Sequence, residues 1–86
     1  MTASPRAKSK EIGVSLRIYR ETVGYRLEDA AIVLECDKSK ISRIETGLRS
    51  IRARDLRELL KAYGVPESEQ QKLVRMLHAL KLPRGG

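Results

Sequence analysis

The 86-residue sequence has few of the residues that hold small secreted proteins together or that place a chain in a membrane. It contains no tryptophan, no phenylalanine and a single cysteine, Cys36. One cysteine cannot form an internal disulfide, which favours a reducing compartment. No apolar run approaches the ~18 residues of a membrane span, and the start, MTASPRAKSK, lacks the apolar stretch of a secretory signal. We therefore expect a cytoplasmic protein with no membrane partner.

Groups for catalysis and for metal or cofactor binding are also scarce. General acid–base catalysis needs carboxylates or histidines positioned in a cleft, but the sequence has one histidine, His78, with no metal-ligand pattern around it. It has no glycine-rich phosphate loop either. The sequence therefore predicts neither an enzyme nor a metal or cofactor site.

Positive charge is what the sequence has in excess. Lys and Arg number 18 against 11 Asp and Glu, which gives a net charge of +7. This balance is typical of proteins that bind a polyanion. The first ten residues hold three bases and no acid, and a second basic stretch consists of Lys38, Lys40, Arg43, Arg49, Arg52 and Arg54.

Hydrophobic spacing predicts helices along the chain and no strand. Apolar residues recur three and four positions apart in five segments, which are 11–23, 27–34, 38–46, 54–63 and 67–80. A chain of this length buries only about 60% of its unfolded surface, so its core must be compact. We expect one all-α domain of five helices over residues 11–82, with a flexible basic arm at 1–10 and a disordered tail at 83–86.

The segment 27–47 contains two apolar stripes that one helix cannot carry. The polar residues 35–38 separate the stripes and change their phase, so a bend is required. Asp37 is suited to cap a second helix, and Gly47 is suited to end it. The spacing therefore predicts a helix-turn-helix motif whose second helix spans 38–46.

At these residues the sequence resembles the helix-turn-helix of the lambda-repressor-like, or Xre-like, family of transcription regulators. The resemblance rests on Ala31 where the motif helices cross, on Ile41 and Ile44 as anchors, and on the run ISRIETG at 41–47. It extends from about residue 11 to 80. It implies a lambda-repressor-like fold and sequence-specific binding of double-stranded DNA, with the second motif helix in the major groove.

Two positions depart from the family pattern, and one pair follows it. The family usually has glycine in the turn, where this chain has Glu35, and a left-handed backbone there would cost on the order of 1 to 2 kcal/mol. We therefore expect a slightly altered turn. Arg26 stands where Thr or Ser often caps the first motif helix, so we assign it to phosphate. The resemblance also implies an ion pair between Arg20 and Glu45, which would set the angle between helices.

Docking geometry selects the residues that would read DNA. The N-terminal part of the second motif helix enters the major groove, so the base-reading candidates are Lys38, Ser39, Ser42 and Arg43. Lys38 and Arg43 are donors that suit the O6 and N7 atoms of guanine, which predicts an important G·C pair in each half-site. The phosphate candidates, which flank the groove, are Arg26, Lys40, Arg49, Arg52 and Arg54. For each candidate, the alternative is a solvated side chain without a role in binding.

The last predicted helix carries a wider apolar surface than one helix contact needs. The candidate dimer surface consists of Val74, Met76, Leu77 and Leu80. A homodimer would set two reading helices about 34 Å apart, and so predicts a palindromic operator. For this surface, the alternatives are a further C-terminal region that covers it and a domain that is monomeric off DNA. For the function, the alternative is a helix-turn-helix module that binds an acidic protein partner.

Overall fold

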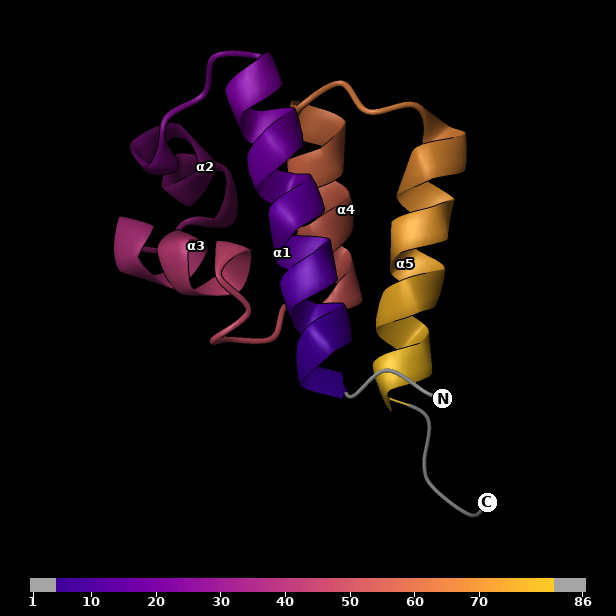
Figure 1. Cartoon of the computed structure of the whole chain (residues 1–86). Coiled ribbons are helices and arrows are strands. Elements are labelled where there is room, and N and C mark those ends of the chain that lie inside the picture. Colours follow the sequence, from indigo (N-terminus) through magenta and orange to yellow (C-terminus); the bar gives the residue numbers. More distant parts are fainter. Residues whose placement is uncertain (1–4, 82–86) are drawn as a thin grey trace.

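The computed structural model describes the backbone of residues 5–81 and the side chains of residues 9–79. Over these residues the chain forms five α-helices and no strand (Figure 1). The helices are α1 (Pro5–Thr22), α2 (Leu27–Leu34), α3 (Lys38–Glu45), α4 (Ala53–Ala62) and α5 (Glu67–Lys81). The predicted all-α fold of five helices is confirmed.

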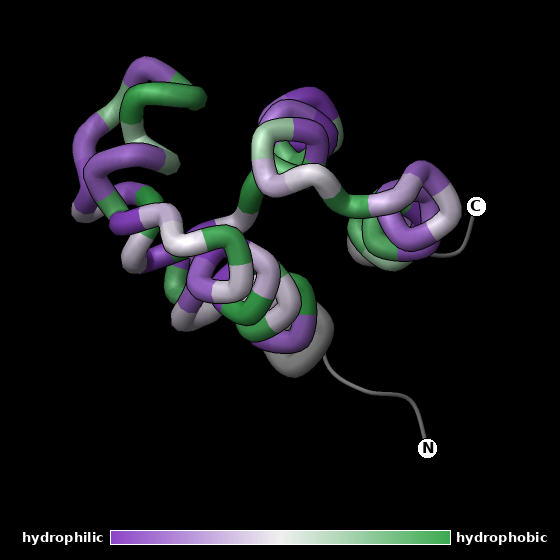
Figure 2. The backbone as a smooth tube through the Cα atoms, turned by 90° about the horizontal axis from the view of Figure 1, so that it is seen from above, coloured by the Kyte–Doolittle hydropathy of each residue, from purple (hydrophilic) through white to green (hydrophobic). Residues whose placement is uncertain are grey.

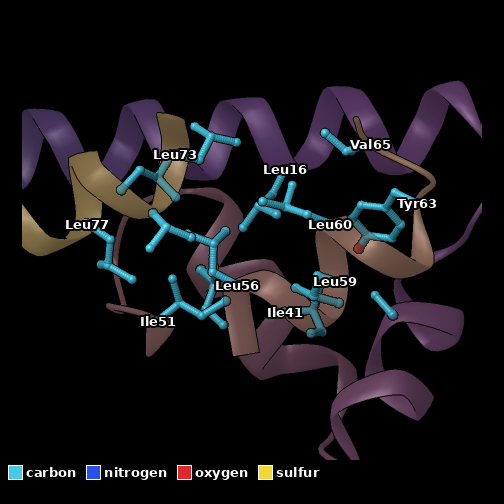
Figure 3. Close-up of a cluster of buried hydrophobic side chains, with 14 of the residues drawn as sticks. Leu16, Ile41, Ile51, Leu56, Leu59, Leu60, Tyr63, Val65, Leu73 and Leu77 are labelled. Carbon is cyan, nitrogen blue, oxygen red and sulfur yellow. The ribbon is translucent and has the colours of Figure 1, made fainter. Parts of the chain in front are cut away.

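The helices pack around α1. Helices α3, α4 and α5 all contact α1, and α2 packs against α3 and α4. Helices α2 and α3 lie together on one side of α1, with α5 on the other (Figure 1). Aliphatic side chains from every helix meet in one core. Figure 3 shows several of these side chains. The hydrophilic segments of α4 and α5 lie on the outside of the bundle (Figure 2).

Helix α1 begins earlier than the sequence predicts. It starts at Pro5 rather than at residue 11, so residues 5–10 of the expected flexible arm are helical. Proline is favourable at the first helical position, and the Arg, Ala and Lys residues that follow are good helix formers. The chain also approaches α3 closely here, because a Cβ atom on Gly47 would lie 2.8 Å from the Cα atom of Lys10. Residues 1–4 and the expected tail at 83–86 lie outside the described residues.

Helix α5 buries most of the surface that the sequence assigns to a dimer. The exposed fractions of Val74 and Leu77 are only 5% and 2%, and Met76 is half-buried against the core. The stripe is wide because α5 packs against two helices, α1 and α4, rather than one. The prediction that Val74 and Leu77 form a dimer surface is therefore wrong. The side chain of Leu80 lies outside the described part of the chain.

The turn between the motif helices keeps a left-handed residue although glycine is absent. Glu35 has φ 53° and ψ 49°, and the next amide, that of Cys36, donates to the carbonyl of Ala31 over 3.0 Å. Asp37 caps α3 as predicted, since its carboxylate accepts the amide of Ser39 over 3.0 Å. The turn is therefore not altered in the way we expected; instead, Glu35 holds a conformation that is costly for a residue with a Cβ atom.

Replacing Glu35 by Gly is expected to raise the free energy of unfolding by about 1 kcal/mol, because glycine adopts a left-handed backbone without the steric cost. Urea unfolding followed by circular dichroism measures the change. The matched control is Glu58→Gly, at an exposed position within α4. This control should lower stability by roughly 1 kcal/mol. A loss of stability in both variants would contradict the prediction.

Candidate nucleic-acid interface

Helix α3 presents one face to the core and another to solvent. It buries Ile41, Ile44 and Glu45. The four base-reading candidates fall on the other side, within about 140° of the helix circumference at ~100° per residue. Lys38, Ser39 and Arg43 are exposed and Ser42 is half-buried. The four side chains are therefore available together on one face of a helix whose opposite face fixes it to the domain.

A cleft of about 810 Å³ runs along this face of α3. One wall is α3 itself, with all four base-reading candidates. The other wall is formed by the end of α1, the following turn and the start of α2, and its residues are Arg20, Glu21, Gly24, Tyr25, Arg26, Leu27 and Glu28. The structure thus brings the phosphate candidate Arg26 to the same cleft as the base-reading candidates.

Three other phosphate candidates meet at a second cleft. Lys40, Arg49 and Arg52 line a space of about 490 Å³ between α3, the loop that follows it and the start of α4. Arg54 is exposed on α4 and is not among the residues that line either cleft. The predicted phosphate residues therefore do not form one cluster: Arg26 lies at the first cleft, three residues line the second, and Arg54 lies at neither.

A buried ion pair fixes α3 to α1. The Arg20 Nε atom donates to Glu45 Oε2 over 2.6 Å, and its Nη2 atom donates to Glu45 Oε1 over 3.0 Å. Both residues are 7% exposed. The hydrogen bond to Glu45 is the main cause that raises the pKa of Arg20. The third guanidinium nitrogen, Nη1, donates over 2.8 Å to the carbonyl of Tyr25, which precedes α2. One arginine therefore ties α1 to both helices of the motif.

The ring of Tyr63 closes the core near this pair. It packs edge-on against Tyr25, with 5.6 Å between ring centroids. Its hydroxyl has no hydrogen-bond partner among the described residues. Burial, followed by the nearby Glu45 carboxylate, raises the pKa of Tyr63 far above its usual value, so the hydroxyl stays neutral. Two packed aromatic rings therefore lie beside the Arg20–Glu45 pair.

Gly13 allows α1 and α3 to cross at short range. A Cβ atom at this position would lie 2.5 Å from the backbone oxygen of Glu45 and 2.7 Å from its carbonyl carbon. No real side chain tolerates such contacts with backbone, so only glycine fits without movement of α3. Among the sequence features, a glycine inside a helical apolar pattern is the signal for such a crossing.

The sequence prediction omits Glu28 from the cleft. Its Oε2 atom lies 3.4 Å from the Nζ atom of Lys38, across the gap between α2 and α3. An acid in the first turn of a helix is ordinary, because it interacts favourably with the helix dipole. Only the crossing of the two helices shows that this carboxylate faces a base-reading candidate.

The described residues contain no group of three or more His, Cys, Asp or Glu side chains placed to hold a metal ion. None of their helices combines the length and the apolar character that crossing a membrane requires.

Comparison with known proteins agrees with the geometry. Residues 11–73 match the family model of a helix-turn-helix domain of the Xre/Cro-like type. The match includes most of α1, all of α2, α3 and α4, and the first half of α5. No curated protein matches the chain.

Proposed function

The chain belongs to an Xre/Cro-like helix-turn-helix family, and from this premise we propose that it binds double-stranded DNA with sequence preference and regulates transcription. Membership of this family suggests DNA binding, and domains of the family are typically not enzymes. The observation that carries the finer proposal is the cleft along α3. Its four outward side chains lie beside Arg26 at the start of α2, so base contacts and a phosphate contact can form together.

In this proposal Lys38, Ser39, Ser42 and Arg43 read base edges. Lys38 and Arg43 offer donors without acceptors, which fits the two acceptors of guanine in the major groove. The exposure of Arg43, at the second turn of α3, leaves its guanidinium free to reach the groove floor. Arg26, Lys40, Arg49, Arg52 and Arg54 would hold the phosphates and fix the register of α3 on the duplex.

Two arginine variants should separate reading from anchoring. Arg43→Ala is expected to weaken binding to the preferred site by about 1 to 3 kcal/mol and to relax the preference for guanine at one position. Arg52→Ala should weaken binding to all sequences alike and reduce the slope of log affinity against log salt by about 0.9. Selection of bound sequences from random DNA, followed by titration at several salt concentrations, measures both effects.

Arg75→Ala serves as the control for the two variants. Arg75 is exposed on α5, which packs against α1 and α4, and its removal changes the net charge by the same amount. This variant should change neither the base preference nor the salt slope. An equal loss for all sequences in Arg43→Ala would contradict base reading by Arg43.

We further propose that two copies occupy a palindromic operator. Because Val74 and Leu77 belong to the core, we infer that the copies are brought together by the two half-sites rather than by an apolar α5 interface. The selection described above tests this arrangement as well. Preferred sites should then show two inverted half-sites about one turn of DNA apart, roughly 34 Å.

A further inference from the structure

Two acidic side chains, Glu21 and Glu28, lie in the cleft that would receive a polyanion, together with the basic residues Arg20, Arg26, Lys38 and Arg43. Glu21 pairs with arginines of its own helix, Arg17 and Arg20. The Glu28 carboxylate instead lies 3.4 Å from the ammonium of Lys38 on α3. A hydrogen bond from its own backbone amide, and then the Lys38 side chain, lower the pKa of Glu28. Glu28 is therefore a carboxylate at neutral pH, at the place where DNA phosphates and base edges approach.

Stability does not explain this arrangement. The side chains of Glu28 and Lys38 are 59% and 62% exposed, and ion pairs this exposed contribute little to folding. The pair does, however, join α2 to the first residue of α3, so it acts on the reading surface itself. Its effect should therefore appear in binding rather than in unfolding.

The carboxylate makes entry into the cleft selective. Any duplex that enters must either leave Lys38 paired with Glu28 or replace Glu28 as the partner of Lys38. Releasing Lys38 breaks its ion pair with Glu28, whatever the sequence of the duplex. A guanine edge presents two acceptors at fixed positions and can compensate for the broken pair, whereas a base that presents a single acceptor compensates less. A cost that the wrong partner does not repay is a common source of specificity, because it lowers the affinity of competitors more than that of the target.

We propose that Glu28 is a specificity-determining residue, which restrains the Lys38 ammonium at the mouth of the cleft and penalises duplexes that cannot compete for it. This inference rests on the proposed DNA binding. It assigns a role in recognition to an acidic residue on the first motif helix, in addition to the basic and hydroxyl side chains of α3.

The test compares Glu28→Gln with Glu35→Gln. Both changes remove one negative charge from α2 or its C-cap, but among the described residues only Glu28 is paired with a base-reading candidate. Glu28→Gln should raise affinity for random duplex, and should lower the ratio of specific to random binding by about two- to fivefold, the range set by an exposed charge pair. Glu35→Gln should leave this ratio unchanged.

A second comparison places the effect on Lys38. In a Lys38→Gln background, Glu28→Gln should no longer lower the ratio, because there is no ammonium left to restrain. Circular dichroism of each variant shows that it is folded, as expected for two exposed side chains. A ratio in Glu28→Gln equal to that of the unsubstituted protein, or an equal fall in both backgrounds, would overturn the role of Glu28 while leaving DNA binding intact. If the unsubstituted protein shows no preference for any duplex, the proposed function fails, and this inference fails with it.

Discussion

Replacing Glu45 by Leu is expected to lower the free energy of unfolding by about 3 to 5 kcal/mol, because it leaves the Arg20 guanidinium buried without its counter-charge. Both partners are 7% exposed, so water cannot compensate for the lost carboxylate. This loss is a large share of the total stability of a small domain. Urea unfolding followed by circular dichroism, or by tyrosine fluorescence, measures it.

The double variant Arg20→Met with Glu45→Leu should be much less damaging. It removes both charges and leaves apolar side chains of similar size, so the main remaining loss is the hydrogen bond to the Tyr25 carbonyl, about 1 kcal/mol. The control is Arg17→Leu, which removes one partner of the exposed Arg17–Glu21 pair without touching Arg20 or Glu45, and should cost less than about 1 kcal/mol. Equal losses in the single Glu45 variant and the double variant would show that the pair is not coupled.

Replacing Gly13 by Ala is expected to destabilise the domain by roughly 1 to 3 kcal/mol through overpacking. The expected decrease in the free energy of unfolding is opposite to the usual effect, since replacing glycine by alanine inside a helix normally stabilises by about 1 kcal/mol. Here the added methyl group meets the backbone of Glu45 at 2.5 Å, and a backbone cannot rotate away as a side chain can. Helix α3 must shift, so we also expect weaker DNA binding than the loss of stability alone would cause.

Thermal unfolding and a binding titration below the melting range measure the two effects of Gly13→Ala. Ser15→Ala is the control, because it places the same residue on α1 at a half-buried site two positions away. It should change stability by no more than about 0.5 kcal/mol. A higher melting temperature for Gly13→Ala would show that α1 and α3 do not meet as closely as described.

Local sequence signals predicted most helix boundaries well. The predicted second motif helix, 38–46, agrees with α3 to within one residue. The agreement arises because Asp37 caps the start of the helix and Gly47 has the positive φ that ends it. The sequence does not reveal the start of α1, for a physical reason. The bases of residues 5–10 are equally compatible with an arm and with a helix, and the close approach of Lys10 to Gly47 is invisible in local sequence.

Apolar periodicity predicts a buried face but not the number of neighbours that cover it. The stripe of α5 therefore suggests a contact with a second copy, although α1 and α4 cover Val74 and Leu77 within one chain. The same limit applies to the cleft. The outward face of α3 follows from its own sequence, whereas the approach of Glu28 depends on the angle at which α2 crosses α3.

In the proposed complex with DNA, the length of α3 limits how many base pairs one domain can contact. Its 8 residues extend about 12 Å at ~1.5 Å per residue, which matches three to four base pairs at ~3.4 Å each. A sequence of four base pairs recurs roughly once in a few hundred base pairs of random DNA, while a genome offers ~10⁶ or more competing sites. A single copy of this helix therefore specifies a short sequence that occurs many times in a genome. Recognition of one particular site requires a second half-site or a contribution from the shape of the intervening DNA.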